Sequence, residues 1–473
     1  MKVLLISTNR NPLPMPVMPV GACLVAQAAE RAGHDVQLLD LMFVRETKAA
    51  IRDALVRNPP DLIALSVRNI DNNAMTDPHF FLHELRELMG EIRSMSCAPL
   101  VLGGAALGVM PEQILRFCPA LCCVTGSGET VFPLLLENIS RNGPLEDVPG
   151  IAWLHQEIFR KNRPPAGAPG CHVPDYNRWL DVPAYTSQLA TFPLQTKTGC
   201  QFNCVYCTYP VIEGNDCLLK DPDRVADAVF RLAAAGFRDI EFVDSIFNSP
   251  RDHAMQVCEA LARVRHGARL QCLELNPLHF DHELVQAMER AGFRGMGITL
   301  ESAADPVLQG LRKGFASSDV HRAAAVVRDC SIPCAWIFML GGPGETRHTV
   351  CESIDFARSQ IRPRDVAFFN IGIRIYPGTE LESIARREGL LKLDRQEMLE
   401  PVFYLSPEVD MPWLKQELSR ALAENMNFIS MDSLGLPFLP TIYRTGKALG
   451  MRPPLWRYTR VVRRCLRLAG MDV

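Results

Sequence analysis

Residues 197–207 read Lys-Thr-Gly-Cys-Gln-Phe-Asn-Cys-Val-Tyr-Cys and follow a short apolar segment. The three cysteines, Cys200, Cys204 and Cys207, have the spacing C-x-x-x-C-x-x-C. Cysteine thiolates are the usual ligands of iron–sulfur clusters. A cluster of four irons needs four ligands, so three cysteines leave one iron open to another molecule, as catalytic metal sites do. The stretch therefore predicts a [4Fe-4S] cluster in a loop that follows a strand.

Two other interpretations of these cysteines are weaker. The chain contains 16 cysteines, so three of them can be ordinary buried residues. A structural zinc site usually has two C-x-x-C pairs or added histidines, and no second pair follows at a suitable distance. The spacing and its context favour the cluster.

The motif, with Tyr206 before its last cysteine, resembles that of radical S-adenosylmethionine (SAM) enzymes. The resemblance implies that SAM binds the open iron through its amino and carboxylate groups. It also implies that one electron from the cluster cleaves SAM to methionine and a 5′-deoxyadenosyl radical, and that a flavodoxin- or ferredoxin-type protein supplies this electron. Tyr206 is expected to shield the cluster from water.

Composition and charge narrow the class of protein. A chain of 473 residues is expected to form two or three domains. The formal net charge of -3 argues against a nucleic-acid-binding protein. The sequence has no apolar run long enough for a transmembrane span and no signal-peptide pattern. Many cysteines without a secretion signal predict a reducing, cytoplasmic location.

The first third of the chain alternates between apolar strands and helices. This pattern predicts a doubly wound, Rossmann-like parallel α/β sheet over residues 1–142. The expected strands are 2–7, 34–41, 61–67, 99–102 and 121–125, and the expected helices are 21–32, 47–57, 79–95, 110–118 and 130–138.

Unusual loops follow four of these strands, at residues 8–20, 68–73, 103–108 and 126–129. Ligands of such sheets bind outside the carboxyl ends of the strands, and glycines there let the backbone approach a large ligand. A single glycine loop would be ordinary turn chemistry, but four at one edge favour a binding site. The candidate cofactor contacts are Asn69, Asp71, Asn72, Gly103, Gly104, Gly126, Ser127, Gly128 and Glu129.

The loops resemble those of the cobalamin-binding domain of cobalamin-dependent radical SAM enzymes. Many cobalamin domains carry D-x-H-x-x-G after the first strand, and its histidine ligates cobalt from below. Residues 8–21 contain no histidine. Either the lower face of the cobalt has no protein ligand or only water, which is common in the radical SAM subclass, or the domain has lost the cofactor.

A connector rich in proline and glycine, residues 143–193, separates this domain from the next. Residues 194–390 contain six strand–helix units, which predict a partial (βα)6 barrel, the radical SAM fold. Residues 391–473 are expected to be a mostly helical extension with an arginine-rich end. Those arginines can meet an anionic substrate, a lipid surface or water, and a solvated face is favoured.

The barrel sequence offers further site residues, because active sites of parallel barrels lie at the carboxyl ends of their strands. Gly341, Gly342, Gly344 and Glu345 resemble the glycine-rich turn beside SAM in the family. Asp244 and Glu301 are expected to accept hydrogen bonds from the SAM ammonium or a ribose hydroxyl. Arg374 suits the SAM carboxylate or an acidic substrate, although a structural role is equally plausible.

The resemblance implies a cobalamin-dependent methyltransferase that uses a [4Fe-4S] cluster, SAM and cobalamin. Its substrate would be an unactivated carbon or phosphorus centre of a small molecule, natural product or lipid. A second hypothesis is an enzyme of the same family that catalyses cyclisation, rearrangement or transfer of another part of SAM. A third is a non-enzymatic iron–sulfur redox or sensor protein, and the turn at Gly341 argues against it.

Overall fold

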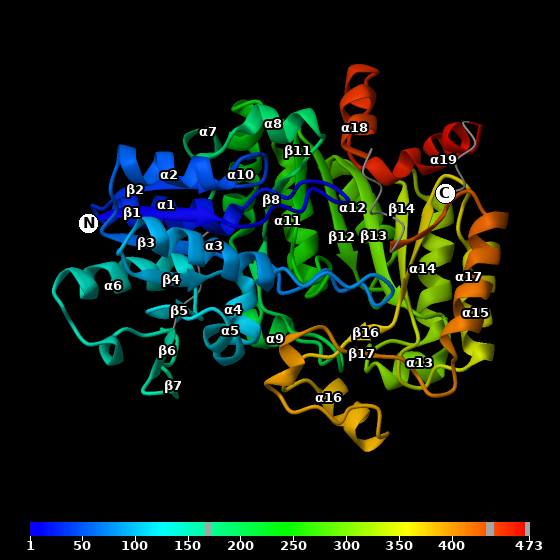
Figure 1. The fold of residues 1–473 in the computed structure, drawn as a ribbon. Coiled ribbons are helices and arrows are strands. Elements are labelled where there is room, and N and C mark those ends of the chain that lie inside the picture. The colour runs from blue at the N-terminus through cyan, green and yellow to red at the C-terminus, as the bar shows by residue number, and fades with distance from the viewer. Residues whose placement is uncertain (166–171, 432–438, 469–473) are drawn as a thin grey trace.

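A computed structural model of the protein describes residues 1–165, 172–431 and 439–468. It contains two α/β units that lie side by side, one blue to cyan and the other green to yellow in Figure 1. The predicted fold class is confirmed. Among the described residues, no helix combines the length and the apolar character that crossing a membrane requires.

The first unit is a seven-stranded sheet in the order β2-β1-β3-β4-β5-β6-β7. Its first five strands are parallel, and the last two are antiparallel additions at one edge. The strands are β1 Lys2–Ser7, β2 Asp35–Asp40, β3 Leu62–Ser66, β4 Leu100–Gly103, β5 Cys122–Val124, β6 Ile151–His155 and β7 Ile158–Lys161. The helices are α1 Val20–Arg31, α2 Thr47–Arg57, α3 Leu82–Met95, α4 Ala105–Val109, α5 Pro111–Phe117 and α6 Gly128–Ser140.

Two details of the first unit differ from expectation. Residues 105–109 form a short helix, α4, where a glycine loop was expected. Gly104 makes the abrupt turn into it with φ +101, and a Cβ there would lie 2.4 Å from the carbonyl oxygen of Val67. Strands β6 and β7 also place residues 151–161 in the first sheet rather than in the connector. The Asn162 side chain secures this edge by donating hydrogen bonds to the carbonyls of residues 145, 146 and 148.

The connector packs against the first unit through two short helices, α7 Tyr176–Trp179 and α8 Val182–Ser187. The carboxylates of Asp175 and Asp181 cap these helices by accepting hydrogen bonds from their first turns. The Tyr185 hydroxyl donates a hydrogen bond of 2.7 Å to Asp40 at the end of β2. Residues 166–171, at the centre of the proline–glycine segment, lie outside the described residues.

The second unit is a parallel sheet in the order β18-β15-β14-β13-β12-β11-β8. Its strands are β8 Phe192–Leu194, β11 Asp239–Phe242, β12 Arg269–Leu275, β13 Phe293–Glu301, β14 Cys334–Leu340, β15 Val366–Ile371 and β18 Phe428–Ser430. The six expected strands are present. The seventh, β18, comes from the carboxyl-terminal extension, which was expected to be mostly helical.

Helices and two short strand pairs complete this unit. The helices are α9 Tyr209–Glu213, α10 Pro222–Ala234, α11 Arg251–Arg263, α12 His282–Ala291, α13 Asp305–Gly310, α14 Ser317–Asp329, α15 Arg347–Gln360, α16 Glu380–Arg387, α17 Met411–Glu424, α18 Leu439–Ala448 and α19 Thr459–Leu468. The antiparallel pairs are β9 Lys197–Thr198 with β10 Leu218–Leu219, and β16 Ile373–Arg374 with β17 Phe403–Tyr404.

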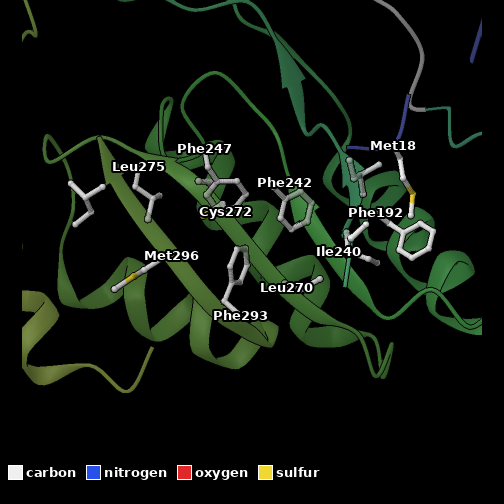
Figure 2. Packing of buried hydrophobic residues seen from close by; sticks show 14 of the residues in the cluster. Met18, Phe192, Ile240, Phe242, Phe247, Leu270, Cys272, Leu275, Phe293 and Met296 are labelled. Carbon is white, nitrogen blue, oxygen red and sulfur yellow. The ribbon is translucent and has the colours of Figure 1, made fainter. Parts of the chain in front are cut away.

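One apolar core runs through both units. Figure 2 shows Met18 of the first unit beside Phe192 of β8, and Phe242, Phe247 and Phe293 further along the second sheet. The ring centroids of Phe242 and Phe293 lie 5.7 Å apart in a stacked arrangement. A shared core favours a fixed position of the two units relative to each other.

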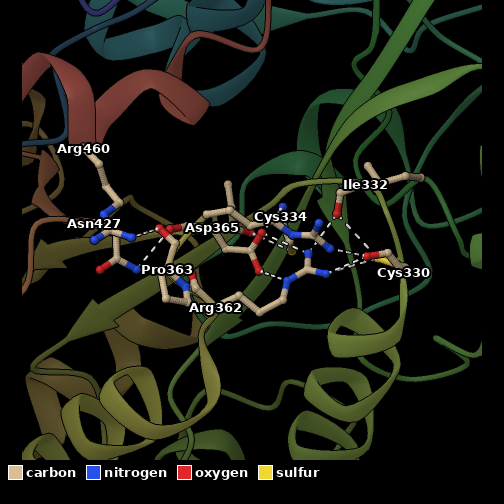
Figure 3. Close-up of polar contacts among 10 residues, drawn as sticks. Cys330, Ile332, Cys334, Arg362, Pro363, Asp365, Asn427 and Arg460 are labelled. Atoms are coloured by element: carbon tan, nitrogen blue, oxygen red, sulfur yellow. Dashed lines mark hydrogen bonds and ion pairs between the residues drawn. The ribbon is translucent and has the colours of Figure 1, made fainter.

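Polar contacts hold β18 at the amino end of the second sheet. Arg362 pairs with Asp365 at 2.6 Å and donates to the carbonyls of Cys330 and Ile332 (Figure 3). The amide of Asn427, next to β18, donates to the carbonyl of Asp365. These bonds satisfy backbone carbonyls just before β14 and β15, and the Asn427 side chain ties β18 to them.

The arginine-rich end of the chain is not simply a solvated face. Arg463 donates to the carbonyls of Asn425 and Phe428 at 3.0 and 2.6 Å, after the end of α17. Arg467 donates to the carbonyl of Ala423, and Arg460 reaches that of Pro363 (Figure 3). Basic side chains at a helix carboxyl end satisfy its free carbonyls. These arginines therefore fasten α19 to α17 and the sheet.

Candidate active site

A cavity of about 1150 Å³ lies between the two units. Its walls come from the loops after β1 and β3, from α3, from the cysteine loop and from the carboxyl ends of β12 to β15. Both sheets thus present the edge at which α/β proteins bind ligands. Residues of the first unit on the wall include Arg10, Arg68, Asn69, Asn72 and Asn73.

The three cysteines of the motif line this cavity together. Gly199, with φ +86, starts their loop after β9, and a Cβ there would lie 2.1 Å from the carbonyl oxygen of Asp216. The backbone N–H of Val205 donates to the carbonyl of Leu311 at 3.1 Å, and that of Cys207 to Cys204 at 3.1 Å. These contacts fix the path of the loop.

These residues suit an iron–sulfur cluster better than a single metal ion. Among the described residues, no three histidine, cysteine or acidic side chains are grouped closely enough to hold one ion. A cluster of four irons spreads its thiolates over a larger volume. Burial raises the pKa of Cys207 to about 12, so coordination would be needed to deprotonate it. A buried oxygen of Glu301, Oε2, also has no hydrogen-bond partner among the residues that the structure describes.

The buried residues Glu301 and Lys313 and the half-buried Tyr206 form a polar group beside the cysteine loop. The Tyr206 hydroxyl donates to Glu301 Oε1 at 2.5 Å, and Lys313 Nζ donates to the same oxygen at 2.9 Å. Lys313 Nζ also lies 3.2 Å from the Tyr206 hydroxyl. Burial by itself would lower the pKa of Lys313, but the Glu301 carboxylate raises it to about 12. All three residues line the cavity.

Asp244 follows β11 and is almost fully buried. Its carboxylate accepts hydrogen bonds from the N–H and hydroxyl of Thr196, at 2.7 and 2.8 Å, and from the N–H of Lys197 at 3.2 Å. The Glu213 carboxylate accepts from the N–H of Gly199 at 3.0 Å. Asp244 thus fixes the strand that leads into the cysteine loop, and it is not part of the cavity wall.

The turn at Gly341, Gly342, Gly344 and Glu345 is fixed by its own glutamate. Glu345 is fully buried, and its carboxylate accepts from the N–H groups of Gly341 at 2.8 Å and Gly342 at 3.3 Å. Burial raises the pKa of Glu345 to about 7. Gly344 has φ +82, and a Cβ there would lie 2.7 Å from the carbonyl oxygen of Pro306. The turn packs against its neighbours and does not line the cavity.

Arg374 and Asp71, both predicted as cofactor contacts, bind each other. Arg374 Nε lies 2.9 Å from Asp71 Oδ2, and both side chains are buried. Arg374 also donates to the carbonyls of Ile375 and Met398. The Tyr376 hydroxyl donates to Asn73 at 2.9 Å. The second unit therefore holds the loop after β3, which brings Asn69, Asn72 and Asn73 to the cavity.

The remaining predicted residues of the first unit lie away from the cavity wall. They are Gly103, Gly104, Gly126, Ser127, Gly128 and Glu129. Gly126 donates its N–H to the carbonyl of Gly150, and Gly128 begins α6. A Cβ on Gly128 would lie 2.6 Å from a methyl group of Val25 on α1. In the structure Gly128 lets α6 approach α1.

Three further residues line the cavity. The sequence places Glu274 at the active-site end of a barrel strand but indicates no specific role for it, and it indicates no role for Lys313 or Met431. Burial raises the pKa of Glu274 to about 7, and the charge of Glu301 adds to the effect. The position of Glu274 at the end of a barrel strand was the sequence signal that could have marked it as a site residue. Lys313 follows α13 in a loop, and Met431 follows β18, so neither occupies a position that a sequence pattern marks.

The comparisons with known proteins agree with this arrangement. The radical SAM superfamily model matches residues 194–357, and the B12 binding domain model matches residues 7–136. An uncharacterised methyltransferase of Pyrococcus horikoshii is 25% identical over 79% of each chain. The tryptophan 2-C-methyltransferase of Streptomyces laurentii is 23% identical over 78% of this chain and 72% of its own.

A solved structure has the same architecture. It is the radical S-adenosylmethionine methyltransferase TsrM from Kitasatospora setae, with cobalamin and a [4Fe-4S] cluster bound. The two chains superimpose with a TM-score of 0.86 over 99% of each, at 24% sequence identity. They share one fold from end to end.

Proposed function

We propose that this chain, a radical SAM enzyme with an amino-terminal B12-binding domain, methylates a small molecule held in the cavity between its two units. One observation carries the proposal: loops of the B12-binding unit and the cysteine loop of the radical SAM unit line the same cavity. When these cofactors are bound, the cluster would supply an electron and SAM would be cleaved or would donate a group. Cobalamin would carry the methyl group that reaches the substrate.

Some of the predicted residues would hold a cofactor directly, and others position the loops that carry those residues. Cys200, Cys204 and Cys207 would ligate the cluster, with Tyr206 covering it. Asn69 offers its amide group to cobalamin from the loop after β3. Asn72 lines the same cavity, but its side chain also closes its own loop, because it donates to the carbonyl of Asp77 and accepts from the N–H groups of Ala74 and His79. The free oxygen of Glu301 would accept a hydrogen bond from SAM.

The other predicted residues act one step away from the ligands. Asp244 positions the cysteine loop, and Glu345 shapes the turn of Gly341, Gly342 and Gly344. Arg374 and Asp71 position the asparagine loop. Gly103, Gly104, Gly126, Ser127, Gly128 and Glu129 would shape the edge of the first sheet on which part of cobalamin lies.

A third part of the wall suits the substrate. Ile337, Met339 and Met431 are apolar, and Asn370 is the polar group among them. They come from β14, β15 and the end of β18. An apolar wall with one amide suits an aromatic or aliphatic molecule that carries a hydrogen-bonding group. The relative from Streptomyces laurentii is a tryptophan methyltransferase, which fits this class of substrate.

The proposal includes a cytoplasmic location and a flavodoxin- or ferredoxin-type electron donor. An oxygen-sensitive cluster and free cysteines are stable in a reducing compartment.

The test is methyl transfer by anaerobically reconstituted protein. The protein is incubated with SAM, cobalamin, a reductant and a panel of aromatic and aliphatic small molecules that includes tryptophan, and mass spectrometry detects methylated products. Cys204→Ala should lose iron, 5′-deoxyadenosine formation and methylation. Cys217→Ala is the matched control, because Cys217 lies beside Gly199 but outside the motif. A Cys204→Ala protein that still methylates would refute the assignment, as would a wild-type protein that binds no cobalamin.

A further inference from the structure

We infer that Lys313 is a positioning residue that makes the iron–sulfur cluster easier to reduce. The inference rests on the cluster in the proposed function and concerns a residue outside the cysteine motif. It starts from the position of Lys313 beside the cluster loop, on the same cavity wall as the three cysteines.

The backbone around Lys313 contacts the cluster loop at two points. The N–H of Val205, between Cys204 and Cys207, donates to the carbonyl of Leu311 at 3.1 Å. Gly314 lies against the ring of Phe202, where a Cβ would be 3.4 Å from the ring carbons. The N–H of Lys313 also donates to the carbonyl of Leu308 at 3.0 Å. These contacts fix Lys313 relative to the cysteines.

The side chain is held as firmly as the backbone. Lys313 is 4% exposed, which is rare for a lysine. Its Nζ donates to Glu301 at 2.9 Å and to the Tyr206 hydroxyl at 3.2 Å. It also lies 5.7 Å from the ring centre of Tyr206 and 5.8 Å from that of Phe315. The charge therefore has one position and little contact with water.

A fixed cation at this place favours the reduced cluster. Reduction adds a negative charge to the cluster, and a nearby positive charge stabilises it more strongly where water is excluded. Glu301 offsets part of this effect. Replacing Lys313 alone would remove the favourable charge and leave the Glu301 carboxylate in place, 2.9 Å from where Nζ lies in the wild type. Loss of Lys313 should therefore disfavour the reduced cluster, and loss of the Glu301 charge should favour it.

A purely structural role makes a different prediction. If Lys313 only holds Tyr206 and Glu301 in place, its loss would change stability or cluster content but not the reduction potential of an intact cluster. The midpoint potential therefore separates the two roles.

The experiment is a redox titration of the reconstituted wild-type protein and of Lys313→Met, without SAM and followed by electron paramagnetic resonance. Methionine has a similar length and no charge. We expect the midpoint to become more negative, with the ratio of reduced to oxidised cluster at fixed potential falling about tenfold, or about 59 mV for one electron. Lys313→Arg keeps the positive charge, so its midpoint potential should lie close to that of the wild type. Arg312→Met is the control, because Arg312 is adjacent and its side chain is 58% exposed.

Glu301→Gln tests the same effect in the opposite direction and does not depend on folding of the Lys313→Met protein. It removes the negative partner and should make the midpoint more positive. An unchanged midpoint in Lys313→Met with full iron content would refute the inference, and so would an unchanged midpoint in Glu301→Gln. Neither result would affect the proposed methylation. A wild-type protein without any cluster signal would instead refute the cluster itself.

Discussion

The guanidinium of Arg374 lies 2.9 Å from the carboxylate of Asp71, although 303 positions separate the two residues in the sequence. Asp71 follows β3 of the first unit, and Arg374 belongs to β16 of the second unit. Both side chains are almost fully shielded from water, at 0% and 2% exposure. The pair therefore connects the two units at the loop that carries Asn69, Asn72 and Asn73 to the cavity.

Replacing one member of this pair should destabilise the protein more than replacing both members with apolar residues. Asp71→Asn leaves the Arg374 charge buried without its partner, which costs about 3–5 kcal/mol. In the double variant Asp71→Leu/Arg374→Met neither charge remains, so much of the lost free energy of unfolding should be recovered. Urea unfolding of Asp71→Leu, of Arg374→Met and of the double variant Asp71→Leu/Arg374→Met measures this coupling. Losses that simply add would show that the two side chains do not act as a pair.

Gly344 should tolerate a methyl group less well than Gly378. Both glycines have φ +82, so alanine costs about 1–2 kcal/mol at either position. A Cβ on Gly344 would also lie 2.7 Å from the carbonyl oxygen of Pro306, whereas nothing lies within 4 Å of a Cβ on Gly378. Gly344→Ala should therefore lose about 1–3 kcal/mol more than Gly378→Ala. Equal thermal midpoints for the two variants would contradict the packing described for this turn.

Glu345 should make stability depend on pH near neutrality. Its pKa rises from 4.5 to about 7 in the folded protein because the carboxyl group is buried. The folded protein therefore favours the protonated form of Glu345, which adds to the free energy of unfolding. This contribution is fully present below pH 4.5, is lost as pH rises through about 7, and is on the order of 3 kcal/mol.

Glu345→Gln removes this titration while keeping an acceptor for the N–H of Gly341. The stability of the wild type relative to Glu345→Gln should therefore fall between about pH 5 and pH 8, as urea midpoints would show. Other titrating groups are common to both proteins and cancel in the difference. Exposed Glu352→Gln should give no such trend. A constant difference across this range would show that Glu345 is ionised throughout.

Bound cobalamin should have no nitrogen ligand below its cobalt. Residues 8–21 contain no histidine, and His79 is the only histidine among the described residues on the cavity wall. Its Nε2 lies 2.7 Å from the carboxylate of Glu84, which also lines the cavity. We expect the dimethylbenzimidazole tail to be displaced as well. The electron paramagnetic resonance spectrum of bound cob(II)alamin should lack nitrogen superhyperfine splitting, with His79→Ala unchanged. Splitting that disappears in His79→Ala would identify a histidine ligand.

The fold and the cluster loop could be predicted because their signals are local. Long apolar strands alternate with helices, and the three cysteines lie within eight positions of one another. The partners of polar residues were less predictable. Asp71 and Arg374 lie at the expected sheet edges, but sequence does not indicate that they bind each other. The same holds for Glu345, which binds its own turn, and for Asp244, which binds the strand before the cysteine loop.

Strand β18 escaped prediction for a different reason. It has only three residues, too few for an apolar period to appear, and its place depends on distant contacts such as that of Asn427 with Asp365. Lys313 likewise lies in a loop where spacing carries no information, and only its three-dimensional neighbours indicate a role.

The position of β18 has a consequence for how this protein is made. β18 pairs with β15 at the edge of the second sheet, yet it lies near residue 430 of 473. During synthesis β15 therefore remains an open edge, with unpaired N–H and C=O groups, after the other strands of the barrel have emerged. Open edges template pairing between chains. Fragments that end at the radical SAM core, near residue 390, should therefore associate or precipitate, and expression of this enzyme should depend on retaining its carboxyl-terminal extension.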